Sequence, residues 1–271
     1  MDPYPSHSFL KTYDIAPTEV VAFSTRREGG CSTGTYSSFN ANAFCGDKPE
    51  DVRSNRFLLC EALNITPERL IIPHQTHQTR VINIDAEFLS MTDEERSTRL
   101  EGIDALITQE SSTCISVSTA DCVPLLYYDA EHKAIAAVHA GWRGTLSRIG
   151  SITLQTMQEL YGTEPSDLKV IIGPSISLDS FEVGQEVYDA FHKAGFPMGE
   201  IAKLMATNGS GEKWHIDLWK ANTLLLESEG VLPDNIYVSG ICTYQNYEEY
   251  FSARRLGAQS GRILNGIMIL E

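Results

Sequence analysis

A cysteine and a histidine with the chemistry to bind a metal or attack a substrate flank a predicted β-hairpin. Two apolar runs, 123–128 and 134–139, enclose the polar segment 129–133, which is typical of two strands joined by a short turn. A turn centred in the middle of that segment would place Cys122 directly opposite His139, with Cβ atoms about 4.5–5.5 Å apart. We therefore expect a thiol and an imidazole at one end of the hairpin.

Two further histidines, His74 and His77, follow the short apolar segment 70–73. Side chains of an extended chain alternate between the two faces, so residues three apart point in opposite directions. We expect only one of the two histidines to reach the site at the hairpin end.

Three residues of type His, Cys and His that leave a fourth position open are typical of catalytic zinc. His77, Cys122 and His139 are the candidates, because each stands at the end of a predicted strand. Zinc held there would lower the pKa of bound water toward about 7, and the same donors suit copper. Two alternatives need no metal: a buried thiol beside two hydrogen-bonded histidines, or Cys122 as nucleophile with His139 as its base, oriented by Asp121 or a backbone carbonyl.

The other histidines stand in segments without obvious chemical partners, and we expect them to be solvated. They are His7 in the expected N-terminal tail, His132 on the hairpin turn, and His192 and His215 in helical or loop stretches.

Four arginines lie in segments rich in glycine, serine or aromatic residues, where a guanidinium can grip phosphate or carboxylate with two hydrogen bonds. They are Arg26, Arg143, Arg254 and Arg255. Arg143 comes just before a predicted helix over 145–161, whose free amides and dipole favour an anion. Together they favour an anionic co-substrate.

Composition narrows the class of protein. The chain has 271 residues, 42% of them hydrophobic, a net charge of −15 and a pI near 4.9, which argues against nucleic acid as a partner. No apolar run approaches the roughly 20 residues of a membrane span, and the N-terminus lacks the pattern of a signal peptide. Six cysteines without CxxC spacing favour the reducing cytoplasm.

The remaining elements predict a single α/β domain over residues 1–271, with mixed, largely antiparallel sheets. Further strands are expected at 19–25, 70–73, 80–84, 104–108, 114–118, 168–173, 236–242 and 263–270. Helices are expected at 49–65, 145–161, 184–193 and 216–229, a surface helix or lid at 85–101, and a loop-rich stretch at 195–213.

Several motifs together resemble the YfiH/laccase-domain family, whose members are viewed as purine nucleoside phosphorylases and were formerly called polyphenol oxidases. The matching segments are TRREGGCSTGTYSSFN at 25–40, GDKPEDVRSNR at 46–56, HQTH at 74–77, STADCVPLL at 118–126, VHAGWRGT at 138–145, IGPSIS at 172–177 and YFSARR at 250–255. The sequence departs from the usual SLNLG after the tyrosine, where it has SFNAN, but Asn40 keeps its place.

The resemblance implies an α/β sandwich similar to the catalytic domain of deamidating toxins. His77, Cys122 and His139 match the metal-binding residues of the family, and His74 is then an extra histidine. The implied activity is phosphorolysis of adenosine, inosine and methylthioadenosine, with deamination of adenosine at the same site. We expect Arg26, Asn40 and Arg143 to cradle phosphate, with Arg143 taking part in catalysis.

Other activities stay open at this point. Arg254 is a further candidate for binding the substrate. A copper-dependent oxidation of phenols is the second enzyme hypothesis, although seven histidines are too few and too scattered for a four-copper oxidase. A metal-free cysteine hydrolase and a non-catalytic sensor of metal or nucleoside are the others.

Overall fold

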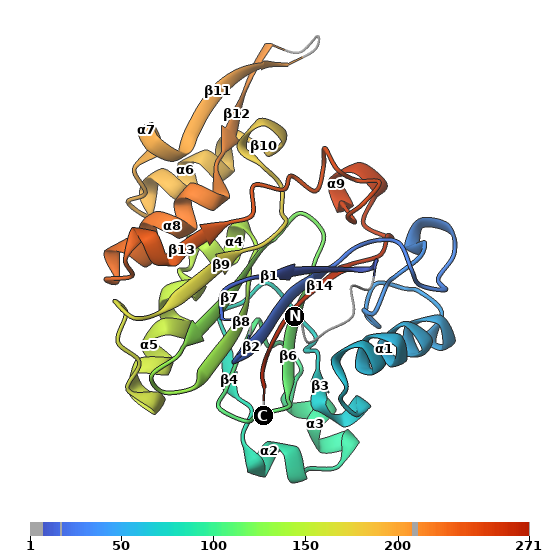
Figure 1. The fold of residues 1–271 in the computed structure, drawn as a ribbon. Helices are drawn as coiled ribbons and strands as arrows, with labels where there is room; N and C mark the ends of the chain where they lie inside the picture. Colours follow the sequence, from blue (N-terminus) through green and yellow to red (C-terminus); the bar gives the residue numbers. More distant parts are fainter. Residues whose placement is uncertain (1–7, 17, 208–210, 271) are drawn as a thin grey trace.

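The structure is a computed structural model that describes residues 8–16, 18–207 and 211–270. Two large sheets form its centre (Figure 1). The five-stranded sheet has the order β1 (Leu10–Tyr13), β2 (Val20–Thr25), β14 (Ile263–Ile269), β6 (Cys114–Thr119) and β3 (Leu70–Ile71). The six-stranded sheet has the order β13 (Ile236–Val238), β9 (Lys169–Ile172), β7 (Val123–Asp129), β8 (Ala134–Ala140), β5 (Ala105–Thr108) and β4 (Val81–Asn83).

A smaller sheet lies beside these two, and the hairpin formed by two of its strands projects from the body of the molecule (Figure 1). Its strands have the order β10 (Glu182–Val183), β12 (Gly211–Ile216) and β11 (Ala202–Thr207). The helices are α1 (Pro49–Leu63), α2 (Ala86–Ser90), α3 (Asp93–Arg99), α4 (Trp142–Leu146), α5 (Ile149–Tyr161), α6 (Gln185–Lys193), α7 (Met198–Ile201), α8 (Leu218–Ser228) and α9 (Ala253–Leu256).

The two large sheets pack face to face, with helices on both outer faces. Side chains of both sheets, such as Val117 and Leu126, share one buried cluster between the sheets. A second cluster joins the outer face of the six-stranded sheet to α5, α6 and α8, and a third joins the five-stranded sheet to α1. Because both faces of each sheet are covered, the strands carry nearly continuous apolar runs.

The predicted fold class is confirmed. The chain forms mixed α/β layers, and most strand pairs are antiparallel, with parallel pairing at β13–β9, β3–β6 and β4–β5. The similarity to deamidating toxins and the extent of the domain over 1–271 stay predictions.

The central hairpin forms as predicted, but its register differs by two residues. Pro124 pairs with His139 and Val123 with Ala140, so the turn occupies four residues, 130–133. The side-chain period of a strand is two, and a shift of two therefore leaves Cys122 on the same face as His139.

Two other expectations were wrong. The helix predicted over 145–161 is two helices, α4 and α5, separated where Arg148 takes a left-handed conformation with φ of 60°. The stretch 195–213, expected to be loop-rich, contains α7 and most of the hairpin β11–β12. The strand sequences AKLMAT and GEKWHI lack the clear alternation of polar and apolar residues that predicts a strand.

Candidate metal centre

The structure brings together the three residues that the sequence pointed to. The potential ligand atoms of His77, Cys122 and His139 all lie within 4.8 Å of one another. Sγ of Cys122 is 4.0 Å from Nε2 of His77, and the two imidazole rings meet edge to face at 4.8 Å between centroids. His139 is buried, Cys122 is half-buried and His77 is exposed, so the centre opens to solvent on the side of His77.

The donor set fits a single metal ion. Two nitrogens and a sulfur at tetrahedral zinc lie about 3.3–3.6 Å apart, given bonds of about 2.0 and 2.3 Å. Binding would therefore draw the three atoms inward by about 1 Å, which side-chain rotations can supply. In the described part of the chain, no other group of three or more His, Cys, Asp or Glu residues has its ligand atoms this close together.

Only one of the two histidines after β3 reaches the centre, as predicted. His77 has a positive φ of 62°, which turns its side chain away from the direction of an extended strand. His74 instead contacts Glu101 at 2.8 Å and stacks on the ring of Phe44. The loop is fixed to the neighbouring sheet because Gln75 bonds both the N–H and the C=O of Ser118.

A buried carboxylate that sequence reasoning missed holds both histidines. Oδ1 of Asp104 accepts hydrogen bonds from Nδ1 of His139 at 2.8 Å and from the backbone N–H of His77 at 3.0 Å. Oδ2 accepts from the backbone N–H groups of Thr76 and Gln78. Since a carboxylate only accepts, His139 carries its proton on Nδ1, which leaves Nε2 free to bind a metal.

The fully buried Asp104 stays ionised. Burial by itself would raise the pKa of this carboxyl, but the hydrogen bond and charge of His139, with the backbone donors, lower the pKa below its usual value. The signal in the sequence was a lone aspartate at the start of an apolar strand, which carries no information about its partner 35 residues away. The hypothesis that Asp121 or a backbone carbonyl orients His139 is therefore wrong.

The thiol and the imidazole form a charged pair in the absence of metal. Burial would raise the pKa of Cys122, but the charge and hydrogen bond of His139, aided by His77, lower the pKa to about 6. Burial would likewise lower the pKa of His139, yet Cys122 and Asp104 raise it to about 9. The thiolate is the form that binds metals and attacks carbon.

Two backbone features let the chain bring Cys122 to this place. A Cβ at Gly141 would lie 2.9 Å from Sγ of Cys122, so the close approach requires glycine. Asp121, next to Cys122, has a φ of 85°. Its carboxylate accepts from the hydroxyl of Thr243 and from the backbone N–H of Arg254, both at 2.7 Å. These bonds fix the strand end.

The residues expected to bind phosphate or substrate occupy different environments. Arg143 lies exposed on α4, where its guanidinium stacks on Trp142 at 4.1 Å. Arg26 is half-buried and lies 3.7 Å from Glu249. Arg254 is exposed and donates to the backbone carbonyl of Glu182. No contact in the structure tests the roles of these three arginines, which stay predictions.

Asn40 is fully buried, and its amide is engaged by the chain. Nδ2 donates to Asp47 at 2.8 Å, and Oδ1 accepts from the backbone N–H of Arg262 at 3.0 Å. These bonds shape the loop that follows β2, and a direct contact with phosphate stays a prediction.

Two of the remaining histidines are not solvated as expected. His132 is half-buried and contacts Asp129 at 2.9 Å. His215 is 7% exposed and donates from Nδ1 to the carbonyl of Leu178. Their partners come from a turn and from another element, and neither partner follows from the type of segment.

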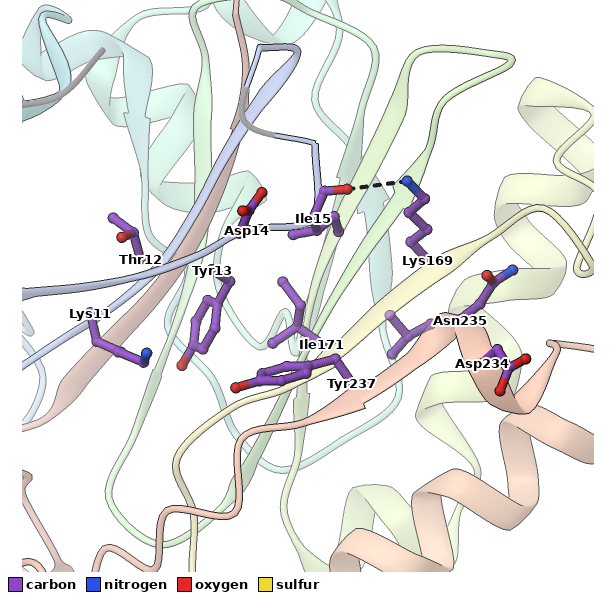
Figure 2. Close-up of a pocket in the computed structure, with 11 residues that line it drawn as sticks. Lys11, Thr12, Tyr13, Asp14, Ile15, Lys169, Ile171, Asp234, Asn235 and Tyr237 are labelled. Carbon is purple, nitrogen blue, oxygen red and sulfur yellow. Dashed lines mark hydrogen bonds between the residues drawn. The ribbon is translucent and has the colours of Figure 1, made fainter. Parts of the chain in front are cut away.

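A cavity of about 440 Å³ lies at the edges of the two large sheets, where β1 approaches β9 and β13 (Figure 2). Tyr13 and Tyr237 line it, and Lys169 donates to the carbonyl of Ile15 at its rim. None of the three residues of the metal centre lines this cavity, so we place the centre elsewhere on the fold.

Comparisons with known proteins give the family of this chain and several named relatives. Residues 21–270 match the family model described as multi-copper polyphenol oxidoreductase laccase. A purine nucleoside phosphorylase of Bacteroides thetaiotaomicron is 51% identical over 91% of this chain and 90% of its own. An adenosine deaminase, RL5, from an unknown prokaryotic organism is 40% identical over 92% of this chain and 93% of its own.

Solved structures show the same fold. YlmD from Geobacillus stearothermophilus is 30% identical and superposes with a TM-score of 0.87, each chain being covered in full. YfiH of Bacillus licheniformis is 25% identical, with a TM-score of 0.83 over 96% of this chain and 99% of its own. Together with the His-Cys-His centre, these likenesses show that the chain belongs to the multi-copper polyphenol oxidoreductase laccase family, to which its motifs had already pointed under the name YfiH/laccase-domain.

Proposed function

We propose that this protein is a purine nucleoside phosphorylase acting on adenosine, inosine and methylthioadenosine, and that it also deaminates adenosine. Residues 1–271 then form one catalytic domain. The observation that carries the proposal is the His77, Cys122 and His139 centre, present in a chain 51% identical to a protein named purine nucleoside phosphorylase. The relative named adenosine deaminase supports the second activity.

The resident metal of this proposal is zinc, with copper as the alternative. His77, Cys122 and His139 would hold it, and a zinc ion supplies Lewis-acid chemistry and activates water. The chain's own part is to keep Cys122 ionised, which His139 and His77 do, and to keep the proton of His139 on Nδ1, which Asp104 does. The six cysteines are all free, which fits the cytoplasmic location expected from the sequence.

Phosphorolysis requires that a phosphate oxygen bond to C1′ of the ribose while the bond from C1′ to the purine breaks. The leaving purine takes up a proton, and the products are the free base and a sugar 1-phosphate. Arg143 is our candidate for holding phosphate, since this exposed arginine follows by two positions Gly141, where an added Cβ would lie 2.9 Å from Sγ of Cys122. Charge-assisted hydrogen bonds from arginine are worth about 1.5–3 kcal/mol each.

A chromatographic assay of adenosine with metal-loaded protein tests this function. With phosphate we expect adenine and ribose 1-phosphate, and without phosphate we expect inosine from deamination. Arg143→Ala should raise the KM for phosphate by about tenfold or more, whereas Arg148→Ala, also an exposed arginine, should not. Stoichiometric protein that binds nucleoside tightly but releases no adenine or inosine would make it a sensor, and copper-dependent oxygen uptake with a phenol would make it an oxidase.

One observation favours a second candidate, a metal-free cysteine hydrolase. Cys122, His139 and Asp104 have the arrangement of nucleophile, base and orienting carboxylate. This mechanism leaves His77 without a role. The two candidates therefore separate in His77→Ala, which should remove a metal-dependent activity and leave a metal-free hydrolase active.

A further inference from the structure

A pocket of about 370 Å³ lies at the junction of the small sheet with the segments around Ser180 and Tyr244. Its volume falls at the lower end of the range for sites that bind small organic ligands. Polar side chains dominate the lining: Asp179, Ser180, Glu182, His215, Tyr244 and Arg254. None of them belongs to the metal centre.

His215 offers this pocket a hydrogen-bond acceptor in a fixed orientation. The residue is 7% exposed, and its Nδ1 lies 2.9 Å from the carbonyl of Leu178. A carbonyl can only accept, so Nδ1 carries a proton, and the neutral tautomer with that proton has its lone pair on Nε2. No partner within the described residues takes that lone pair, and the ring lines the pocket.

The charges of the lining disfavour an anion. Two carboxylates, Asp179 and Glu182, face one guanidinium, that of Arg254, and this guanidinium already donates to the backbone carbonyl of Glu182 at 3.1 Å. Carboxylates and Nε2 of His215 accept hydrogen bonds and repel phosphate. They suit a neutral molecule rich in hydroxyl and amino donors, and the ring of Tyr244 adds a flat face.

The pocket is connected to the metal centre through Asp121. This residue precedes Cys122, and its carboxylate accepts from the backbone N–H of Arg254 and from the hydroxyl of Thr243, the neighbour of Tyr244. Its backbone carbonyl accepts from Ile176, which leads into the segment with Ser180. One lining residue, Arg254, is therefore bonded directly to the residue next to the proposed metal ligand, and the segments that carry Ser180 and Tyr244 are bonded to it nearby along the chain.

We propose that this pocket holds the neutral nucleoside, with Nε2 of His215 accepting a hydrogen bond from one of its hydroxyl or amino groups, and that phosphate binds outside it. The inference rests on the proposed function for the identity of the nucleoside. It adds His215 and Glu182 as residues that determine which substrate is taken.

Two variants of the metal-loaded protein test the pocket. His215→Asn keeps a donor close to the position of Nδ1 but removes the acceptor at the position of Nε2, and we expect the KM for adenosine and the Kd for inosine to rise about tenfold. Glu182→Gln should raise both about threefold or more. Glu212→Gln, an exposed residue of β12 outside the pocket, is the matched control, and thermal unfolding checks that each variant is folded.

The KM for phosphate separates this proposal from an anion site. We expect both variants to leave it within twofold of the wild-type value. If phosphate bound here, Glu182→Gln would lower its KM, because a repelling charge is removed, and the proposal would be overturned.

Equilibrium dialysis with labelled inosine, without phosphate, separates this inference from the proposed function, because inosine is neither deaminated nor phosphorolysed under these conditions. Wild type that binds inosine but shows no turnover when phosphate is added, with weaker binding in His215→Asn, would defeat the function and support the pocket. Normal turnover in wild type, with unchanged inosine affinity in both folded variants, would support the function and overturn the pocket.

Discussion

Two buried aspartates, one near each end of the central hairpin, each hold a histidine, but only one pair belongs to the candidate metal centre. At the turn, Asp129 contacts Nδ1 of His132 at 2.9 Å, three residues along the chain. At the open end, Asp104 contacts Nδ1 of His139 at 2.8 Å from a neighbouring strand. The distance between carboxylate oxygen and ring nitrogen is therefore nearly the same in the two pairs.

The surroundings of the two pairs make the difference. The ring of His132 is 31% exposed and that of His139 is 2% exposed. Among the described residues, the carboxylate of Asp129 otherwise bonds only the backbone of its own turn, whereas that of Asp104 also fixes the loop that carries His77. An aspartate–histidine contact therefore indicates a metal site only where further ligands converge on the free nitrogen.

The largest expected effect comes from removing the sulfur ligand. Cys122→Ala leaves two histidines, and we expect bound zinc to be lost on dialysis and phosphorolysis to fall about 1,000-fold or more. Metal analysis and the adenosine assay measure both. His132→Ala, at the other end of the hairpin, should change neither the bound zinc nor the rate of phosphorolysis. If Cys122→Ala kept both its zinc and its rate, the two ends of the hairpin would not differ in function.

Replacing each of the two aspartates by asparagine compares the two pairs directly. Asp104→Asn should weaken zinc binding about 10–100-fold, because an amide holds His139 and the loop of His77 less well. Asp129→Asn, the matched buried substitution, should leave zinc affinity within twofold. Competition with a chromophoric chelator measures this, and equal losses in the two variants would show that Asp104 has no special part.

The smallest expected effect concerns the reactivity of Cys122 in metal-free protein. Because its pKa is about 6, the thiol is mostly thiolate at pH 7, and its alkylation by iodoacetamide should slow as the pH falls below 6. His139→Phe removes the stabilising charge, so the pKa rises and the rate at pH 7 should fall about tenfold. His132→Phe should leave the rate unchanged.

Cys60 provides an internal reference for this measurement. Burial raises its pKa to about 11, so peptide mapping at pH 7 should show Cys122 modified and Cys60 intact. Equal labelling of Cys122 in the wild type and in His139→Phe would show that the imidazole does not activate the thiol.

The sequence alone determined the elements and the candidates. Apolar runs of strand length around a polar turn predicted the central hairpin, and its period of two placed Cys122 and His139 on one face even though the register was wrong. The motifs then indicated the family and singled out His77 over His74. These inferences succeed because they depend on local patterns of side-chain type.

Tertiary structure decided which polar groups remain free to react. Nothing near Asn40 along the chain indicated that Arg262 would occupy its carbonyl, and nothing near His139 indicated Asp104. His215 looked solvated in sequence, yet it is buried, bonds the carbonyl of Leu178 and lines a pocket. A hydrogen bond between distant residues depends on how the sheets pack, and the periodicity of each strand carries no information about that packing.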